Sequence, residues 1–211
     1  MECIVGDVST REGCEHIASE AGKILGGSPL DVLVNNAGAG WGEPLDRESG
    51  KMNWGWDKVL DVNLKGVFYM TRSCLPYLTR KDLPAENPGR IINVGSVAGM
   101  IPQAIPTHAY DVSKAGVHHL TKKMSSDLAP LGITVNALAP GFVPTKMTEG
   151  LKTYTTFEKM AQSNLLGRMG DGDDMTGACV YLSSRAGSYV TGLILNVDGG
   201  LVGGASIPVS D

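Results

Sequence analysis

The chain has 211 residues, of which 42% are hydrophobic and 19% are charged, and its formal net charge is −4 at pH 7. This composition is typical of one soluble globular domain and excludes a disordered or fibrous protein. The Lys and Arg residues are scattered, which excludes a basic surface for nucleic acid or an anionic membrane and leaves small molecules as the expected ligands.

The cysteines and the start of the chain bear on its compartment. The four cysteines form no CxxC pair and no metal-like cluster with the four histidines; they are Cys3, Cys14, Cys74 and Cys179. This pattern favours reduced thiols, a cytoplasmic location and no bound metal. No apolar run reaches the roughly 18 residues of a membrane span, and "MECIVGDVST" lacks the features of a secretion signal.

Short apolar runs alternate with amphipathic segments from one end of the chain to the other. The runs are "CIVGDV" at 3–8, "LDVLVNNAG" at 30–38, "GRIINVGS" at 89–96, "GITVNALAPG" at 132–141 and "LILNVDGG" at 193–200. They predict one α/β domain, residues 1–211, with a parallel sheet flanked by helices. Strands buried on both faces should be nearly all apolar, as are Val32, Leu33, Val34, Ile91, Ile92, Val94, Ile133, Val135 and Leu138.

Small or polar residues follow each of the last four predicted strands. They are Asn35 to Gly38, Gly95 and Ser96, Pro140 and Gly141, and Asp198 to Gly200. Because ligands bind at the carboxyl ends of parallel strands, these tips should share one edge and form a cleft. Taken singly, each glycine could equally serve only a tight turn.

Two predicted helices carry polar side chains in unusual places. The segment 56–78 reads as one amphipathic helix, and Asn63 falls on its apolar side, where an unpaired amide would cost roughly 1 to 3 kcal/mol. Its partners could be backbone groups alone. Tyr110 precedes Lys114 by four residues, so the ammonium can lie beside the phenol and favour its ionised form. The alternative is an exposed pair on a solvated helix.

Six motifs together resemble the short-chain dehydrogenase/reductase family. They are "NNAG" at 35–38, "VNLKGVF" at 62–68, "GSVAG" at 95–99, "YDVSK" at 110–114, "APGFVPT" at 139–145 and "VDGG" at 197–200. The resemblance spans nearly the whole chain and implies a Rossmann-like sheet. Within the family, "NNAGAGWG" and "INVGSVAG" are similar to 3-oxoacyl reductases of the rhamnolipid-biosynthesis type.

The resemblance implies a catalytic role for four residues. Tyr110 would exchange a proton with a carbonyl or alcohol oxygen, and Ser96 would hold that oxygen by a hydrogen bond. Lys114 would lower the pKa of Tyr110 and bind the nicotinamide ribose, while Asn63 would position a water leading to Lys114. Donors placed where negative charge develops stabilise hydride transfer to a ketone. Alone, Ser96 could be only a hydroxyl that caps the next turn.

A nicotinamide cofactor must supply the hydride, because no side chain can. The resemblance implies NAD or NADP and favours NADP. The residues it places at this cofactor are Asp7, Val8, Asn35, Ala37, Gly38, Tyr110, Lys114, Pro140, Gly141, Val143 and Thr145.

The segment 142–169 matches the family's substrate lid. Its apolar residues could line a pocket or simply pack the segment onto the body; they are Val143, Met147, Leu151, Tyr154, Phe157 and Met160. A medium-chain 3-oxoacyl group or another apolar ketone is compatible with such a pocket. His108, His118 and His119 are expected on a helix surface, and "DGDD" at 171–174 is expected to start a helix.

The chain departs from the family pattern at its beginning. The family starts with a strand, a Gly-rich turn, a helix and a second strand, whereas "MECIVGDV" resembles the third strand. The first two strands and the Gly-rich turn are therefore expected to be absent, and cofactor affinity should fall. The run 3–8 is expected either to pair with "VLVNN" or to detach from the sheet.

Two classes of function follow. The first is an NAD(P)-dependent oxidoreductase that interconverts a ketone and a secondary alcohol. The second is a catalytically silent family member that acts as a binding or assembly partner. The resemblance implies a homo-oligomer, a dimer or tetramer, formed through the helices around Asn63 and Lys114.

Overall fold

The computed structural model describes residues 1–48, 54–80 and 87–204. Four strands form one sheet: β1 (Val32–Asn35), β2 (Gly89–Val94), β3 (Ile133–Pro140) and β4 (Ile194–Val197). The α-helices are α1 (Arg11–Leu25), α2 (Trp54–Leu60), α3 (Gly66–Leu78), α4 (His108–Leu128), α5 (Lys146–Gly150), α6 (Phe157–Gln162) and α7 (Gly172–Ser183). A π-helical stretch, η1 (Asp61–Lys65), joins α2 to α3, and the 3-10 helices are η2 (Val97–Gly99), η3 (Ala129–Leu131), η4 (Leu151–Thr153) and η5 (Arg185–Gly187).

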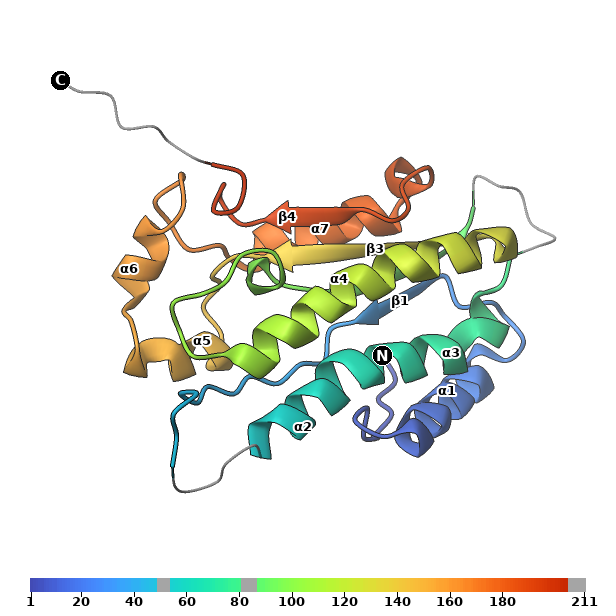
Figure 1. Ribbon diagram of the computed structural model, residues 1–211. Coiled ribbons are helices and arrows are strands. Elements are labelled where there is room, and N and C mark those ends of the chain that lie inside the picture. Colours follow the sequence, from blue (N-terminus) through green and yellow to red (C-terminus); the bar gives the residue numbers. More distant parts are fainter. Residues whose placement is uncertain (49–53, 81–86, 205–211) are drawn as a thin grey trace.

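The sheet is parallel throughout, with strand order β1-β2-β3-β4. Figure 1 shows α3 and α4 in front of the sheet and α7 behind it, which is the layered α/β arrangement that the alternating runs predicted. That residues 1–211 form a single domain with a substrate lid at about 142–169 stays a prediction.

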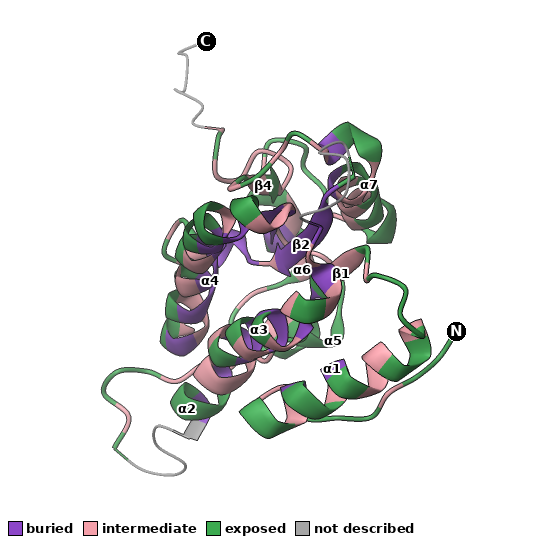
Figure 2. Ribbon diagram, turned by 90° about the vertical axis from the view of Figure 1, so that its right-hand side faces the viewer, coloured by how far each residue is buried: buried purple, intermediate pink, exposed green. Residues whose placement is uncertain are grey.

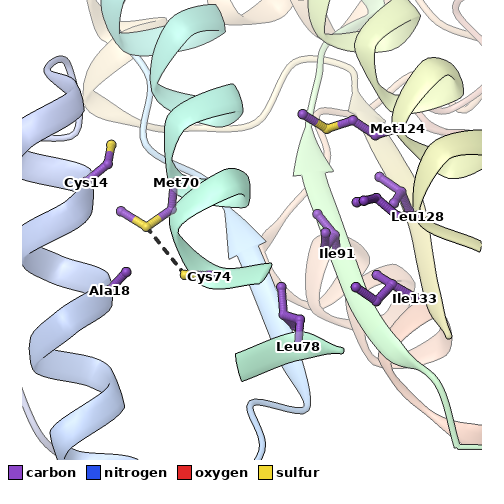
Figure 3. Close-up of a cluster of buried hydrophobic side chains, with 10 residues drawn as sticks. Cys14, Ala18, Met70, Cys74, Leu78, Ile91, Met124, Leu128 and Ile133 are labelled. Carbon is purple, nitrogen blue, oxygen red and sulfur yellow. Dashed lines mark hydrogen bonds between the residues drawn. The ribbon is translucent and has the colours of Figure 1, made fainter. Parts of the chain in front are cut away.

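Successive side chains of β2 and β3 point to opposite faces of the sheet, and both sets are buried. On one face, Ile91 and Val135 pack with residues of α1, α3 and α4, among them Met70, Cys74 and Met124 (Figure 3). On the other face, Ile92 and Leu138 pack against Leu182 of α7. The apolar runs at 89–96 and 132–141 are thus confirmed as buried strands.

The edge strand β1 differs from its prediction. Val32 and Leu33 are only half-buried and Val34 is 43% exposed, because the described residues place no strand on the outer side of β1. Burial of that run depends on a neighbour that the run itself cannot reveal.

The N-terminal run 3–8 forms no strand in the structure. It extends alongside α1 instead (Figure 2), where Gly6 lies against Ile17, and Val5 is 86% exposed. Of the two expected outcomes, detachment from the sheet is the one observed, and the prediction of a strand at 3–8 is wrong.

The predicted helix 56–78 is present as α2, η1 and α3 in unbroken succession. Asp171 caps α7, accepting hydrogen bonds from the N–H groups of Asp173 and Asp174, so "DGDD" starts a helix as predicted. Among the described residues, no helix is long and apolar enough to cross a membrane, and no group of three or more potential ligands could hold a metal ion.

Candidate active site

Three strand tips and the segment after β3 enclose a cavity of about 530 Å³. Gly38 follows β1, Ser96 follows β2 and Gly141 follows β3, and all three line the cavity. The tip of β4 lies next to it, since Gly141 also lines an adjoining hollow with Asp198, Gly199 and Gly200. The strand tips therefore share one edge, as predicted from parallel strands.

Ser96 stands at this edge between β2 and α4. It is the N-cap of η2, and its hydroxyl accepts a hydrogen bond of 3.2 Å from the Ala98 N–H. The side chain of Ser96 also lies near enough to the Tyr110 hydroxyl to lower the pKa of that phenol. Ser96 thus caps a turn and also lies with Tyr110 at the wall of the cavity.

Tyr110 lies in the first turn of α4. Burial raises the pKa of its phenol, the Ser96 side chain lowers it, and the nearby Asp111 carboxylate raises it, so that the net shift is upward. The prediction of a lowered pKa is therefore wrong for this structure, in which burial of the phenol outweighs the other influences. A raised pKa keeps the phenol protonated at neutral pH, which is the form that can donate a proton.

The position of Lys114 explains why the pKa of Tyr110 is not lowered overall. Its Nζ lies 5.6 Å from the centroid of the Tyr110 ring and donates a hydrogen bond of 2.7 Å to the carbonyl oxygen of Val94. The residue is 4% exposed, and burial lowers its own pKa to about 8. The alternative of a solvated surface pair is wrong, because this side of α4 faces the end of β2.

Asn63 lies in the π-helical stretch η1, and such stretches are often found at functional sites. Its Oδ1 accepts from the Ala39 N–H at 2.7 Å, and its Nδ2 donates to the Ala39 carbonyl at 2.9 Å and to the Ser113 hydroxyl at 3.0 Å. The partners are thus mainly backbone, with one hydroxyl. A water-positioning role stays a prediction.

Gly38 lies between Asn63 and Lys114. A Cβ at this position would lie 3.6 Å from Asn63 Oδ1 and 3.8 Å from Lys114 Nζ. The absent side chain leaves the backbone of Gly38 open to the cavity, next to a buried ammonium. Ala37, which precedes it, is exposed and does not line the cavity.

The other residues predicted to bind the cofactor fall into two groups. Near the cavity, Pro140 ends β3 beside Gly141, Thr145 caps α5, and the Val143 carbonyl accepts a 2.8 Å hydrogen bond from Thr148.

Away from the cavity, the Asn35 amide nitrogen donates to Thr71 and Asn93 in the core. Asp7 accepts hydrogen bonds from the N–H and hydroxyl of Ser9, and Val8 packs on the core beside α1. None of Asn35, Asp7 and Val8 lines the cavity.

The lid segment 142–169 covers one side of the cavity. Met147, Leu151 and Tyr154 line it, as one alternative predicted, and Phe142 joins them. Met160 is buried instead, and the Phe157 ring lies 4.2 Å from the Lys152 ammonium. Met160 therefore fits the packing alternative, whereas Val143 and Phe157 do not line the cavity.

Several residues at the site were missed from the sequence. His118 was expected on a helix surface but is buried, while His108 and His119 are exposed as expected. Its spacing of four residues after Lys114 puts it on the same helix face, and that signal could have found it. Trp41 lines the cavity from the loop after β1, where no periodicity marks it.

The sequence comparisons agree with this geometry. Residues 1–202 match a protein-family profile described as enoyl-(acyl carrier protein) reductase. The rhamnolipids biosynthesis 3-oxoacyl-[acyl-carrier-protein] reductase of Pseudomonas aeruginosa is 37% identical over 200 residues, covering 94% of this chain and 76% of that protein. The chain belongs to the short-chain dehydrogenase/reductase family.

Other members of the short-chain dehydrogenase/reductase family are comparably similar. Galactitol 2-dehydrogenase of Rhizobium johnstonii is 37% identical over 205 residues, covering 95% of this chain and 75% of that protein. Among solved structures, the Pseudomonas aeruginosa RhlG/NADP active-site complex matches with a TM-score of 0.84 and 36% identity, covering 94% of this chain and 76% of that one.

The site fits one end of the dinucleotide that this family implies. The backbone of Gly38, the buried ammonium of Lys114 and the open wall at Gly141 can accommodate a ribose and a flat ring. At the pyrophosphate end, the described residues contain no Gly-rich turn that leads from a strand into a helix. The nicotinamide end therefore fits, and these residues would hold it.

Proposed function

We propose that the chain is an NAD(P)-dependent oxidoreductase that interconverts a ketone and a secondary alcohol. The observation that carries this proposal is that the side chains of Ser96 and Tyr110 meet at the wall of a cavity beside the buried Lys114. A hydroxyl, a protonated phenol and an ammonium converge there from β2 and α4.

Each of these side chains has a distinct task in the reduction. Ser96 donates a hydrogen bond to the carbonyl oxygen and holds it near Tyr110. Tyr110 transfers its proton to that oxygen as negative charge develops, and the nearby Lys114 ammonium stabilises the phenolate that remains. NADPH or NADH, when bound, supplies the hydride to the carbonyl carbon. In oxidation the proton moves back to Tyr110.

The substrate we propose is a 3-oxoacyl thioester of medium chain length. Phe142, Met147 and Leu151 give one side of the cavity an apolar surface. The Pseudomonas relative is a 3-oxoacyl reductase by name, and its solved complex contains NADP, which supports NADP as the cofactor here.

The test combines binding and turnover. The purified chain is titrated with NADPH and with NADH while nicotinamide fluorescence is measured, and NADPH oxidation is then followed with a 3-oxo-octanoyl thioester. Saturable binding and ketone-dependent oxidation support the proposal. Absence of both in the folded chain overturns it.

A silent assembly partner is the second candidate. Phe68 on α3 and Val112 on α4 are large apolar side chains that remain exposed. These helices would join copies of the chain into a dimer or tetramer. Light scattering that reports an oligomer, together with no cofactor binding, would favour this candidate over the enzyme.

A further inference from the structure

His118 lies buried beneath the turn that carries Ser96. It is 7% exposed, and its Nε2 accepts a hydrogen bond from the backbone N–H of Ser96, with 3.4 Å between the nitrogens. The backbone of Gly99 also lies near the ring, where it acts to raise the pKa of His118. One imidazole thus lies against both ends of the segment Ser96–Gly99.

The neighbouring glycines give this imidazole its place. A Cβ built on Gly95 would overlap Nε2 of His118, so the ring occupies the space that this glycine leaves free. A Cβ on Gly99 would lie 2.6 Å from the backbone nitrogen of Ala115, so the turn packs directly on α4. His118 and the two glycines therefore form one contact between the end of β2 and the helix that carries Tyr110.

The protonation state suits this hydrogen bond from Ser96. Burial, followed by the charge of Lys114, lowers the pKa of His118 to about 4. The ring is therefore neutral at physiological pH, and a neutral imidazole accepts at one nitrogen while it donates from the other. The imidazole can therefore hold the Ser96 N–H.

We propose that His118 is a positioning residue that orients Ser96 toward Tyr110 by fixing the backbone of the segment Ser96–Gly99. The proposal rests on the proposed function for its catalytic consequence, but the structural link itself does not depend on a cofactor. If His118 only filled space, an apolar side chain of similar size would replace it without effect on Ser96 or Tyr110.

The first test needs no catalysis. Amide hydrogen exchange at Ser96 and the pKa of Tyr110, followed by NMR of the ring carbon bonded to oxygen, are measured in the chain and in His118→Leu. We expect Ser96 exchange to rise on the order of tenfold. The pKa of Tyr110 should rise, because the Ser96 side chain lowers it. The matched control is His119→Leu, an exposed neighbour on the same helix, which should change neither quantity.

A second variant covers the case in which His118→Leu does not fold. His118→Gln keeps an acceptor for the Ser96 N–H, so its exchange rate should lie between those of wild type and the leucine variant. Unchanged Ser96 exchange or an unchanged Tyr110 pKa in a folded His118 variant overturns the proposal.

Activity separates this proposal from the proposed function. In ketone reduction, His118→Leu should lower kcat on the order of tenfold to a hundredfold and change KM little, with partial recovery in His118→Gln. A changed KM with an unchanged kcat would contradict a positioning role for His118. If the wild-type chain reduces no ketone, the proposed function fails, while the exchange and titration measurements still decide the role of His118.

Discussion

The ammonium of Lys114 donates a 2.7 Å hydrogen bond to the carbonyl oxygen of Val94, the last residue of β2. Ser96 follows Val94 by two residues, so this bond ties the helix that carries Tyr110 to the strand that leads into Ser96. His118 makes a second connection one turn further along α4. The three proposed catalytic side chains are thus held by a strand end and a helix that are linked at two points.

Lys114 should reduce the stability of the fold at neutral pH. Its pKa falls from 10.5 to about 8, so below pH 8 both the folded and unfolded states carry the charge and the burial penalty is present in full. Lys114→Met removes a penalty of about 3 kcal/mol and loses one hydrogen bond, so the free energy of unfolding at pH 7 should rise by about 1 to 2 kcal/mol.

Urea unfolding at pH 7 and at pH 10 checks this prediction. Wild type should gain stability relative to Lys114→Met as pH rises from 8 to 10.5, since the folded state loses the charge first. Lys122→Met, at an exposed position of the same helix, is the control and should match wild type. A Lys114→Met variant less stable than wild type at pH 7 would contradict the prediction.

Asn63 should contribute strongly to stability through its three hydrogen bonds. Asn63→Ala leaves the Ala39 N–H and carbonyl and the Ser113 hydroxyl without this partner in a buried place. The free energy of unfolding should fall by about 2 to 4 kcal/mol. Urea unfolding with an unchanged m-value measures the loss, and Asn196→Ala, at an exposed position of β4, should cost less than about 1 kcal/mol.

His118 should make the fold sensitive to acid. Its pKa is about 4 in the folded chain against an ordinary 6.5, so between these values the unfolded state binds a proton that the folded state does not. Stability then falls as pH decreases from 6.5 toward 4, by up to ~1.4 kcal/mol per pH unit. Unfolding at pH 7 and pH 5 should show a smaller loss in His118→Gln than in wild type, and equal losses would contradict the lowered pKa.

Leu151 should influence substrate chain length. It lines the cavity from the lid segment, and Leu151→Asn replaces part of the apolar wall with an amide. The KM for an eight-carbon 3-oxoacyl thioester should rise about tenfold, since a few buried methylene groups contribute 1 to 3 kcal/mol. The four-carbon substrate is the internal control and should change little. Equal changes in KM for both substrates would place the acyl chain away from Leu151.

The sequence predicted those parts of the molecule that local pattern determines. The strands at 89–96 and 132–141 and the cap at Asp171 followed from periodicity and turn residues, and the convergence of Ser96 and Tyr110 followed from the resemblance to the family. Exposure at Val34 did not, because it depends on which strand lies beside β1. The upward pKa shift of Tyr110 did not either, since helical spacing brought Lys114 near the ring but could not show that its ammonium binds Val94.

The most direct test of the central claim is the rate at which this chain oxidises NADPH in the presence of a 3-oxo-octanoyl thioester, compared with Tyr110→Phe. Wild type should consume NADPH in equal amount to the ketone reduced, and loss of the phenolic proton donor should slow turnover by about 10² to 10⁴-fold. A wild-type chain that folds and binds NADPH but reduces no ketone, or a Tyr110→Phe variant that reduces it at the wild-type rate, would contradict the account.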